Sequence, residues 1–210
     1  MGRIEKIILP TGYFPPVSYF AYILHSHSVF IEQMETFPRQ TYRNRCEILT
    51  SSGKLNLIVP VSKPNGNHTL TRDIEICYRE PWQQHHWKSI QTAYRSSPFF
   101  NYYADIILPL FTNKESSLIA LNNNISRILG IITGINAEFH FTEDYVKSPG
   151  EMLDLRSAFS PHKKQFKFQF REYPQVFGHR SGFTGDLSIL DVIFNLGPET
   201  KDYLMEAVVI

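Results

Sequence analysis

The chain has 210 residues and a hydrophobic content of 42%, which suffices for one large domain with a buried core or for two small domains. Its formal net charge is +1, with 21 basic residues scattered among 20 acidic ones, so composition gives no support for binding to nucleic acid or to an anionic membrane surface. No apolar run approaches the roughly 18 residues that a membrane-spanning helix needs. We expect a cytoplasmic protein, because the first residues lack the pattern of a secretion signal.

The first part of the chain predicts a parallel βαβ unit. Residues 4–9 form an apolar run that stops at Pro10, which is typical of a short buried strand. The Pro15-Pro16 pair predicts the start of a helix that continues to about residue 26, because proline is tolerated in a first helical turn. Residues 29–33 form a second apolar run. Strand, helix and strand in this order imply that the two strands pair in parallel.

The next segments predict a hairpin and then a group of helices. Residues 45–50 and 54–61 flank a polar turn, and apolar side chains alternate along the second run, so the two form an antiparallel hairpin. Residues 74–78 and 137–142 predict further strands. Between them, apolar residues recur at helical spacing from about residue 81 to 131, which predicts a helical cluster that covers the sheet.

The C-terminal part is less regular. Residues 146–165 carry no clear period, whereas residues 166–170 alternate phenylalanine with polar residues and predict a strand or an extended arm. Residues 188–196 predict a helix that stops at Gly197-Pro198. We therefore expect one α/β domain over residues 1–210, with a mixed sheet that begins with the parallel unit and continues with the hairpin.

Three blocks of sequence carry a resemblance to a known family. They are residues 10–16 (Pro-Thr-Gly-Tyr-Phe-Pro-Pro), residues 42–45 (Tyr-Arg-Asn-Arg), and residues 94–100 together with the late residues 187–195. In this order they resemble the WbqC-like proteins of bacteria. The resemblance implies a place in surface-polysaccharide biosynthesis of the O-antigen type, and it implies no particular reaction.

The segment Arg43-Asn44-Arg45 is the best candidate for binding an anion. We expect it to be extended, with both guanidinium groups on the same side, where they match a phosphate or a carboxylate through paired hydrogen bonds. The alternative is a solvated strand end in which an arginine pairs with Glu32 or Glu35. A nucleotide-sugar phosphate and a carboxylate fit the anion site equally well.

Two further features are candidates for the site. Tyr13 lies in the aromatic and proline-rich turn and is expected to stack on a nucleobase or sugar, while the helix that follows offers free backbone N–H groups to an anion. The alternative is that this turn simply packs the start of the helix. His86 shares a helix face with Trp82 and Ile90, so it is either a proton-transfer residue or a hydrogen-bonded core histidine.

Glu32 completes the set of predicted site residues. It lies near the end of the second strand, where the carboxyl ends of parallel strands commonly build ligand sites, and we consider it as a catalytic carboxylate. The alternative is a surface carboxylate without a catalytic role.

Two hypotheses for function follow. The first is a transferase acting on an activated, nucleotide-linked sugar, with acyl or aminoacyl transfer as plausible as glycosyl transfer. Its partner is a small anionic substrate, either a nucleotide sugar or an acyl donor. The second is a non-catalytic scaffold that contacts a polysaccharide-biosynthesis enzyme through the phenylalanines Phe166, Phe168 and Phe170. The sequence contains no cofactor-binding motif and no cluster of metal-ligating residues.

Overall fold

A parallel sheet of four strands forms one side of the protein, as shown by the computed structural model, which describes residues 4–160, 163–164 and 168–209. In sheet order its strands are β7 (Glu138–Phe141), β2 (Ser26–Glu32), β1 (Ile4–Pro10) and β8 (Leu153–Asp154). Helix α1 (Val17–Leu24) joins β1 to β2, and the two strands pair in parallel. The predicted α/β class and its βαβ unit are therefore confirmed.

The predicted hairpin is also present, but it forms a separate two-stranded sheet beside the parallel one and does not continue it as the expected mixed sheet would. Its strands are β3 (Arg45–Thr50) and β4 (Gly53–Ile58), which pair antiparallel with Arg45 opposite Ile58. Three shorter antiparallel pairs complete the strands of the described residues: β5 (Val61–Ser62) with β6 (Glu75–Ile76), β9 (Phe159–Ser160) with β10 (Lys163–Lys164), and β11 (Phe168–Gln169) with β12 (Val208–Val209).

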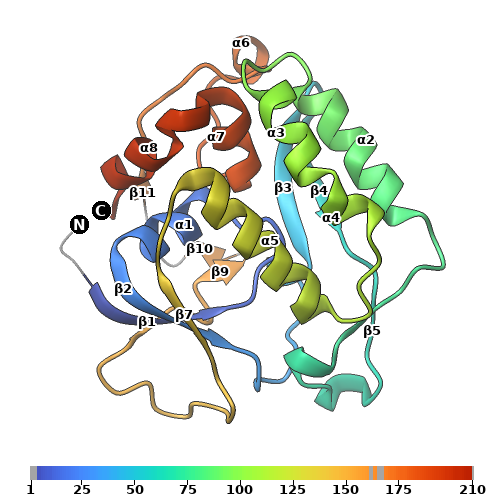
Figure 1. Ribbon diagram of the computed structural model, residues 1–210, viewed down its shortest axis with the longest axis vertical. Coiled ribbons are helices and arrows are strands. Elements are labelled where there is room, and N and C mark those ends of the chain that lie inside the picture. The colour runs from blue at the N-terminus through green and yellow to red at the C-terminus, as the bar shows by residue number, and fades with distance from the viewer. Residues whose placement is uncertain (1–3, 161–162, 165–167, 210) are drawn as a thin grey trace.

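Helices cluster in the middle of the chain, as predicted. They are α2 (Trp82–Tyr94), α3 (Phe100–Ile107), α4 (Pro109–Thr112) and α5 (Leu118–Thr133). Figure 1 shows α2, α3 and α4 in green on one side of the hairpin, with α5 in yellow-green crossing toward the parallel sheet. Helix α5 passes Gly130 and ends at Thr133, and the next residue, Gly134, has a φ of 65°, the left-handed conformation common after a helix.

The C-terminal part of the chain is mostly helical, and its last two helices pack against α1. The C-terminal helices are α6 (Gly178–Ser181), α7 (Ile189–Leu196) and α8 (Thr200–Glu206), and short 3-10 turns occur at Gly66–His68, Thr71–Asp73 and Gly197–Glu199. Helix α7 begins where expected because the Ser188 hydroxyl accepts a hydrogen bond from the backbone of Leu190, as an N-cap does. Both α7 and α8 contact α1, which places them against the βαβ unit.

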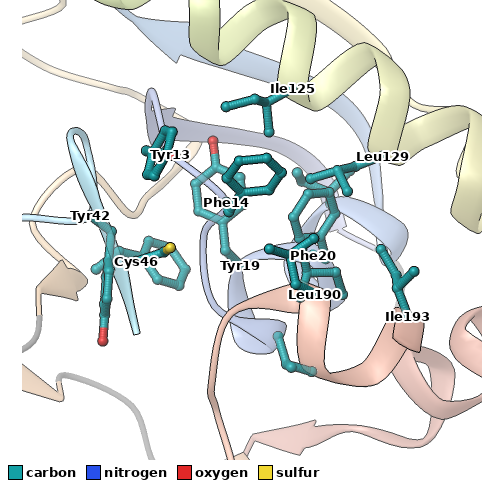
Figure 2. Packing of buried hydrophobic residues seen from close by; sticks show 14 of the residues in the cluster. Tyr13, Phe14, Tyr19, Phe20, Tyr42, Cys46, Ile125, Leu129, Leu190 and Ile193 are labelled. Carbon is teal, nitrogen blue, oxygen red and sulfur yellow. The ribbon is translucent and has the colours of Figure 1, made fainter. Parts of the chain in front are cut away.

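The hydrophobic core joins these layers. Figure 2 shows Phe14 and Phe20, from the turn before α1 and from α1 itself, facing Ile125 and Leu129 of α5. Leu190 of α7 closes the other side of Phe20. These side chains are almost fully buried, so α1 is held between α5 and α7 by the removal of apolar surface from water.

The turn after β1 is tight and fully buried. A Cβ atom at Gly12 would approach the Cβ of Pro15 to 2.9 Å, so the turn requires glycine there. Phe14 has a φ of 39°, an unfavourable conformation for a residue with a side chain. Its ring stacks on Phe111 with centroids 5.6 Å apart, and this packing offsets the backbone strain.

A buried carboxyl group attaches the segment before α7 to the core. Asp191 is 1% exposed, and its Oδ2 accepts hydrogen bonds from the Tyr173 hydroxyl and from Gln175 Nε2. Gln175 in turn exchanges two hydrogen bonds with the backbone of Thr184. Burial raises the pKa of Asp191 above its usual range, against the opposing effect of these donors. Asp191 therefore has a structural role in this cluster.

The raised pKa of Asp191 predicts a pH dependence of stability. The folded state binds the proton more tightly than the unfolded state, so the contribution of Asp191 to stability is greatest below its ordinary pKa and declines as pH rises through the folded-state pKa. We expect the unfolding free energy of Asp191→Asn to fall less than that of the unmodified protein as the pH rises above about 4, measured by guanidinium unfolding. An identical pH dependence in the variant would show that this carboxyl group does not titrate abnormally.

Candidate functional site

A cleft of about 460 Å³ lies at the edge of the parallel sheet where the strands end. It is lined by residues within 35–43 and 154–160 and by Tyr145, and we call it the carboxyl-edge cleft. β1 lies at the centre of the sheet, with β2 on one side and β8 on the other, so the segments leaving β2 and β8 form opposite walls. Open α/β sheets bind ligands in this position, and the volume suits a small molecule.

An ion pair between Arg43 and Glu35 forms one wall of the cleft. Arg43 is 2% exposed; its Nε donates to Glu35 Oε1 at 2.7 Å, and its Nη2 lies 2.6 Å from the same oxygen. Nη2 also donates to the backbone oxygen of Arg156. Burial raises the pKa of Glu35, while the guanidinium of Arg43 acts in the opposite direction. Glu35 is thus a carboxyl group at the cleft with a perturbed pKa, a feature common at functional sites.

A second ion pair forms the opposite wall. Arg156 donates from Nε and Nη2 to the two carboxylate oxygens of Asp154 at 2.9 and 2.7 Å. Its Nη1 lies 3.3 Å from Glu32 Oε2 and also donates to the backbone oxygen of Val146. The Tyr145 ring lies over this guanidinium, 5.4 Å from its carbon, and is 51% exposed. Arg156 therefore connects the ends of β2 and β8 with the segment between β7 and β8.

Glu32 supports this wall from inside the protein. It is fully buried, and its two oxygens accept hydrogen bonds from the backbone N–H of Met34 and Val146 and from the Thr142 hydroxyl, besides the contact with Arg156. The surface alternative for Glu32 is therefore wrong. Its position fits a residue that orients the cleft, and a direct part in catalysis stays a prediction.

The predicted anion-binding segment reaches the cleft through one residue. Arg43 lies in a turn and lines the cleft, whereas Arg45 is the first residue of β3 and is not among the lining residues. This arrangement differs from the expected extended segment with both guanidinium groups on one side. Asn44 instead connects this turn to the end of the hairpin: its Nδ2 donates to the Val59 oxygen at 2.9 Å, and its own backbone oxygen accepts from the Val59 N–H.

Helix α5 holds the Arg43 turn in place. Asn122 Nδ2 donates to the backbone oxygen of Arg43 at 2.8 Å and to the Thr11 hydroxyl at 3.0 Å, so one buried side chain joins α5, the turn after β1 and the cleft. Sequence reasoning missed Asn122 because it lies among the apolar residues of an amphipathic helix, where no motif distinguishes it.

Tyr13 and His86 lie together in the core and do not line the carboxyl-edge cleft. The Tyr13 hydroxyl is 2.8 Å from His86 Nδ1, and the two side chains are 1% and 6% exposed. Burial lowers the pKa of His86 to about 4. In this structure the buried Tyr13 ring packs against Phe14 and Trp82, so it has no free face for stacking on a ligand.

The start of α1 is covered by the chain itself. The Ser18 N–H donates to the Asp186 carboxylate at 2.9 Å, and the Val17 N–H donates to the Leu187 oxygen. The expectation that this helix offers free N–H groups to an anion is therefore wrong. The backbone N–H groups at the start of α1 are not free because the segment before α7 accepts their hydrogen bonds.

Neither a metal-binding cluster nor a membrane-spanning helix is found among the residues that the structure describes. No three His, Cys, Asp or Glu side chains gather there closely enough to hold a metal ion. In the same part of the chain, none of the helices has both the length and the apolar character needed to cross a membrane.

Comparison with known proteins gives a family and one full-length relative. The model of the WbqC-like protein family matches residues 11–160. The chain is 27% identical over 225 residues to the uncharacterized protein Rv1507c of Mycobacterium tuberculosis, covering 94% of this chain and 96% of the relative. No solved structure gives a significant match.

Proposed function

Because the chain belongs to the WbqC-like protein family, we propose that it acts in bacterial surface-polysaccharide biosynthesis, as a transferase on a nucleotide-linked sugar bound in the carboxyl-edge cleft. The observation that carries this proposal is the combination of arginines and a carboxyl group with a raised pKa at the strand ends. Such sites suit the binding of an anionic substrate and the transfer of a proton.

Each group has a proposed role. Arg39, on the exposed rim, and Arg43, in the wall, bind the phosphate groups and balance the charge that develops on the leaving group. Tyr145 supports the sugar or the base through its exposed ring. Glu35 accepts the proton of the acceptor hydroxyl or amine as that group attacks the donor. We prefer Glu35 to Glu32 because Glu35 lines the cleft, whereas the oxygens of Glu32 are occupied.

Removal of the rim arginine tests where the ligand binds. Arg39 is exposed and its Nη2 donates to Asn67, so Arg39→Ala leaves the wall of the cleft intact. We expect this variant to bind nucleotide sugars about fivefold more weakly, a loss of about 1 kcal/mol, because one exposed charge-assisted contact is removed. Isothermal titration calorimetry with a panel of UDP-, GDP- and dTDP-sugars measures the change.

The control for this measurement is Arg79→Ala, which removes an exposed arginine that does not line the cleft. Unchanged affinity in Arg39→Ala, or equal weakening in both variants, would contradict binding at the carboxyl-edge cleft. If no nucleotide sugar bound the unmodified protein, the proposed substrate class would be wrong.

A second candidate function is the binding of a protein partner, and an apolar groove between α5 and the edge strand β7 favours it. The groove is lined by Ile31, Phe139 and Phe141, and Phe141 is 43% exposed. The alternating phenylalanines of residues 166–170 support this candidate less well. Phe168 stacks on Phe170 and packs against the core, and Phe166 lies outside the described residues. Under this alternative, a pull-down with a glycosyltransferase of surface-polysaccharide biosynthesis would recover less of that partner with Phe141→Ser than with the unmodified protein.

A further inference from the structure

Hydrogen bonds within the protein leave few charged atoms of the cleft for a ligand. All three guanidinium nitrogens of Arg156 are engaged, with Asp154, Glu32 and the Val146 oxygen. On the opposite wall, Arg43 uses Nε and Nη2, and Glu35 uses Oε1. Among the described residues, no partner is found for Arg43 Nη1 or for Glu35 Oε2. The Arg43–Glu35 pair therefore keeps one guanidinium nitrogen and one carboxylate oxygen that no described residue engages.

The charges at this site are also balanced. Arg39, Arg43 and Arg156 line the cleft, and the carboxyl groups of Glu35 and Asp154 line it with them, while Glu32 lies directly behind. A ligand that carries only negative charge would be repelled by the Glu35 carboxylate when it approaches Arg43, because the two side chains are in contact. A ligand that carries a cation beside its anionic group satisfies both, because like charges in a partly buried site are unfavourable and opposite charges are not.

The difference in exposure between Arg39 and Glu35 gives the ligand a direction. Arg39 is on the exposed rim, whereas the side chain of Glu35 is 14% exposed and lies deeper. Thr41, which also lines the cleft, has a buried hydroxyl without a hydrogen-bond partner among the described residues. An unsatisfied buried polar atom at a cleft is a feature that a polar ligand would relieve. The anionic group therefore fits the rim and the polar, cationic group fits the interior.

We propose that the carboxyl-edge cleft recognises a phosphorylated or nucleotide-linked amino sugar, with its protonated amine on Glu35 Oε2 and its phosphate on Arg39. The inference rests on the proposed function and specifies its substrate class. Glu35 then receives one proton from the ammonium group, which leaves a neutral amine and a protonated carboxyl group. In acyl transfer the amino sugar is the acceptor: the neutral amine nitrogen bonds to the acyl carbon of an acyl donor while the bond from that carbon to the donor's leaving group breaks, and the phosphate stays on the sugar.

A comparison of three sugar phosphates tests this recognition by calorimetry. Glucosamine 1-phosphate carries an amine where glucose 1-phosphate carries a hydroxyl and where N-acetylglucosamine 1-phosphate carries a neutral amide. We expect the unmodified protein to bind the amine about tenfold more tightly than either neutral analogue, because a charge-assisted hydrogen bond is lost in both. In Glu35→Gln this preference is expected to disappear, whereas Glu5→Gln, an exposed change on β1, keeps it.

The outcomes separate the two proposals. Equal affinity for the three sugar phosphates in the unmodified protein would overturn the inference and leave the binding of anionic sugars standing. Binding of nucleotide sugars without any binding of glucosamine 1-phosphate would also overturn the inference alone. Failure of every sugar phosphate and every nucleotide sugar to bind would overturn the proposed function together with it. The comparison within the unmodified protein decides the matter even if Glu35→Gln does not fold.

Discussion

Glu32→Ala is expected to lower the free energy of unfolding by about 3–5 kcal/mol, the range found when one partner of a buried ion pair is removed. The carboxylate is fully buried and satisfies two backbone N–H groups, the Thr142 hydroxyl and the Arg156 guanidinium. Alanine would leave these donors without an acceptor and would open a small cavity between the ends of β2 and β8. Chemical unfolding followed by circular dichroism measures the loss.

Two further variants make this result specific. Glu32→Gln keeps the size of the side chain and one amide oxygen, so we expect a smaller loss than with alanine. Glu5→Ala removes an exposed carboxylate from β1 and is expected to change stability by less than about 0.5 kcal/mol. A loss below about 1 kcal/mol in Glu32→Ala would mean that this carboxylate does not hold the cleft together.

Through His86 alone, the free energy of unfolding is expected to fall by about 2 kcal/mol when the pH is lowered from about 7.5 to about 5. Burial lowers the pKa of His86 to about 4 in the folded protein, whereas an unfolded histidine titrates at about 6.5. Between these values the unfolded state binds a proton that the folded state does not bind. Stability is therefore lost as the pH falls through the pKa of the unfolded histidine.

His86→Gln isolates this contribution. Glutamine cannot take up a proton in this range, and its amide can still form a hydrogen bond with the Tyr13 hydroxyl. We expect the fall in unfolding free energy over the same pH range to be about 2 kcal/mol smaller in this variant. His85→Gln is the matched control, because His85 is the exposed neighbour on the same helix. An unchanged pH dependence in His86→Gln would refute a buried, neutral histidine.

The parallel unit and the central helices could be predicted because their signals are local. Residues 4–9 form a continuous apolar run bounded by Pro10, and the helices from 81 to 131 repeat apolar residues at a fixed spacing. The fourth strand of the sheet had no such signal. β8 consists of Leu153 and Asp154 alone and is defined by its pairing with Ile7 and Ile8, a contact between residues far apart in the chain.

The candidate site could be predicted only where its signal is local in the sequence. Arg43 could be identified because a short segment rich in arginine suggests anion binding whatever the fold. Arg156 and Asp154 lie where the sequence has no period, and they become a site only when β8 pairs beside β1. Tyr13 was predicted to contact a ligand but lies in the core. An aromatic turn has the same sequence pattern whether it lines a pocket or packs in the core, and only the burial of the side chain in the structure distinguishes the two.

The most direct test of the account is hydrogen–deuterium exchange of the full chain with and without its tightest-binding nucleotide sugar. If the ligand binds in the carboxyl-edge cleft, we expect slower exchange at amides within residues 35–43 and 154–160, which form the two walls of the cleft. Peptides around Tyr13 and His86 are expected to exchange at unchanged rates. Protection confined to those two core residues, or no protection by any nucleotide sugar, would contradict the account.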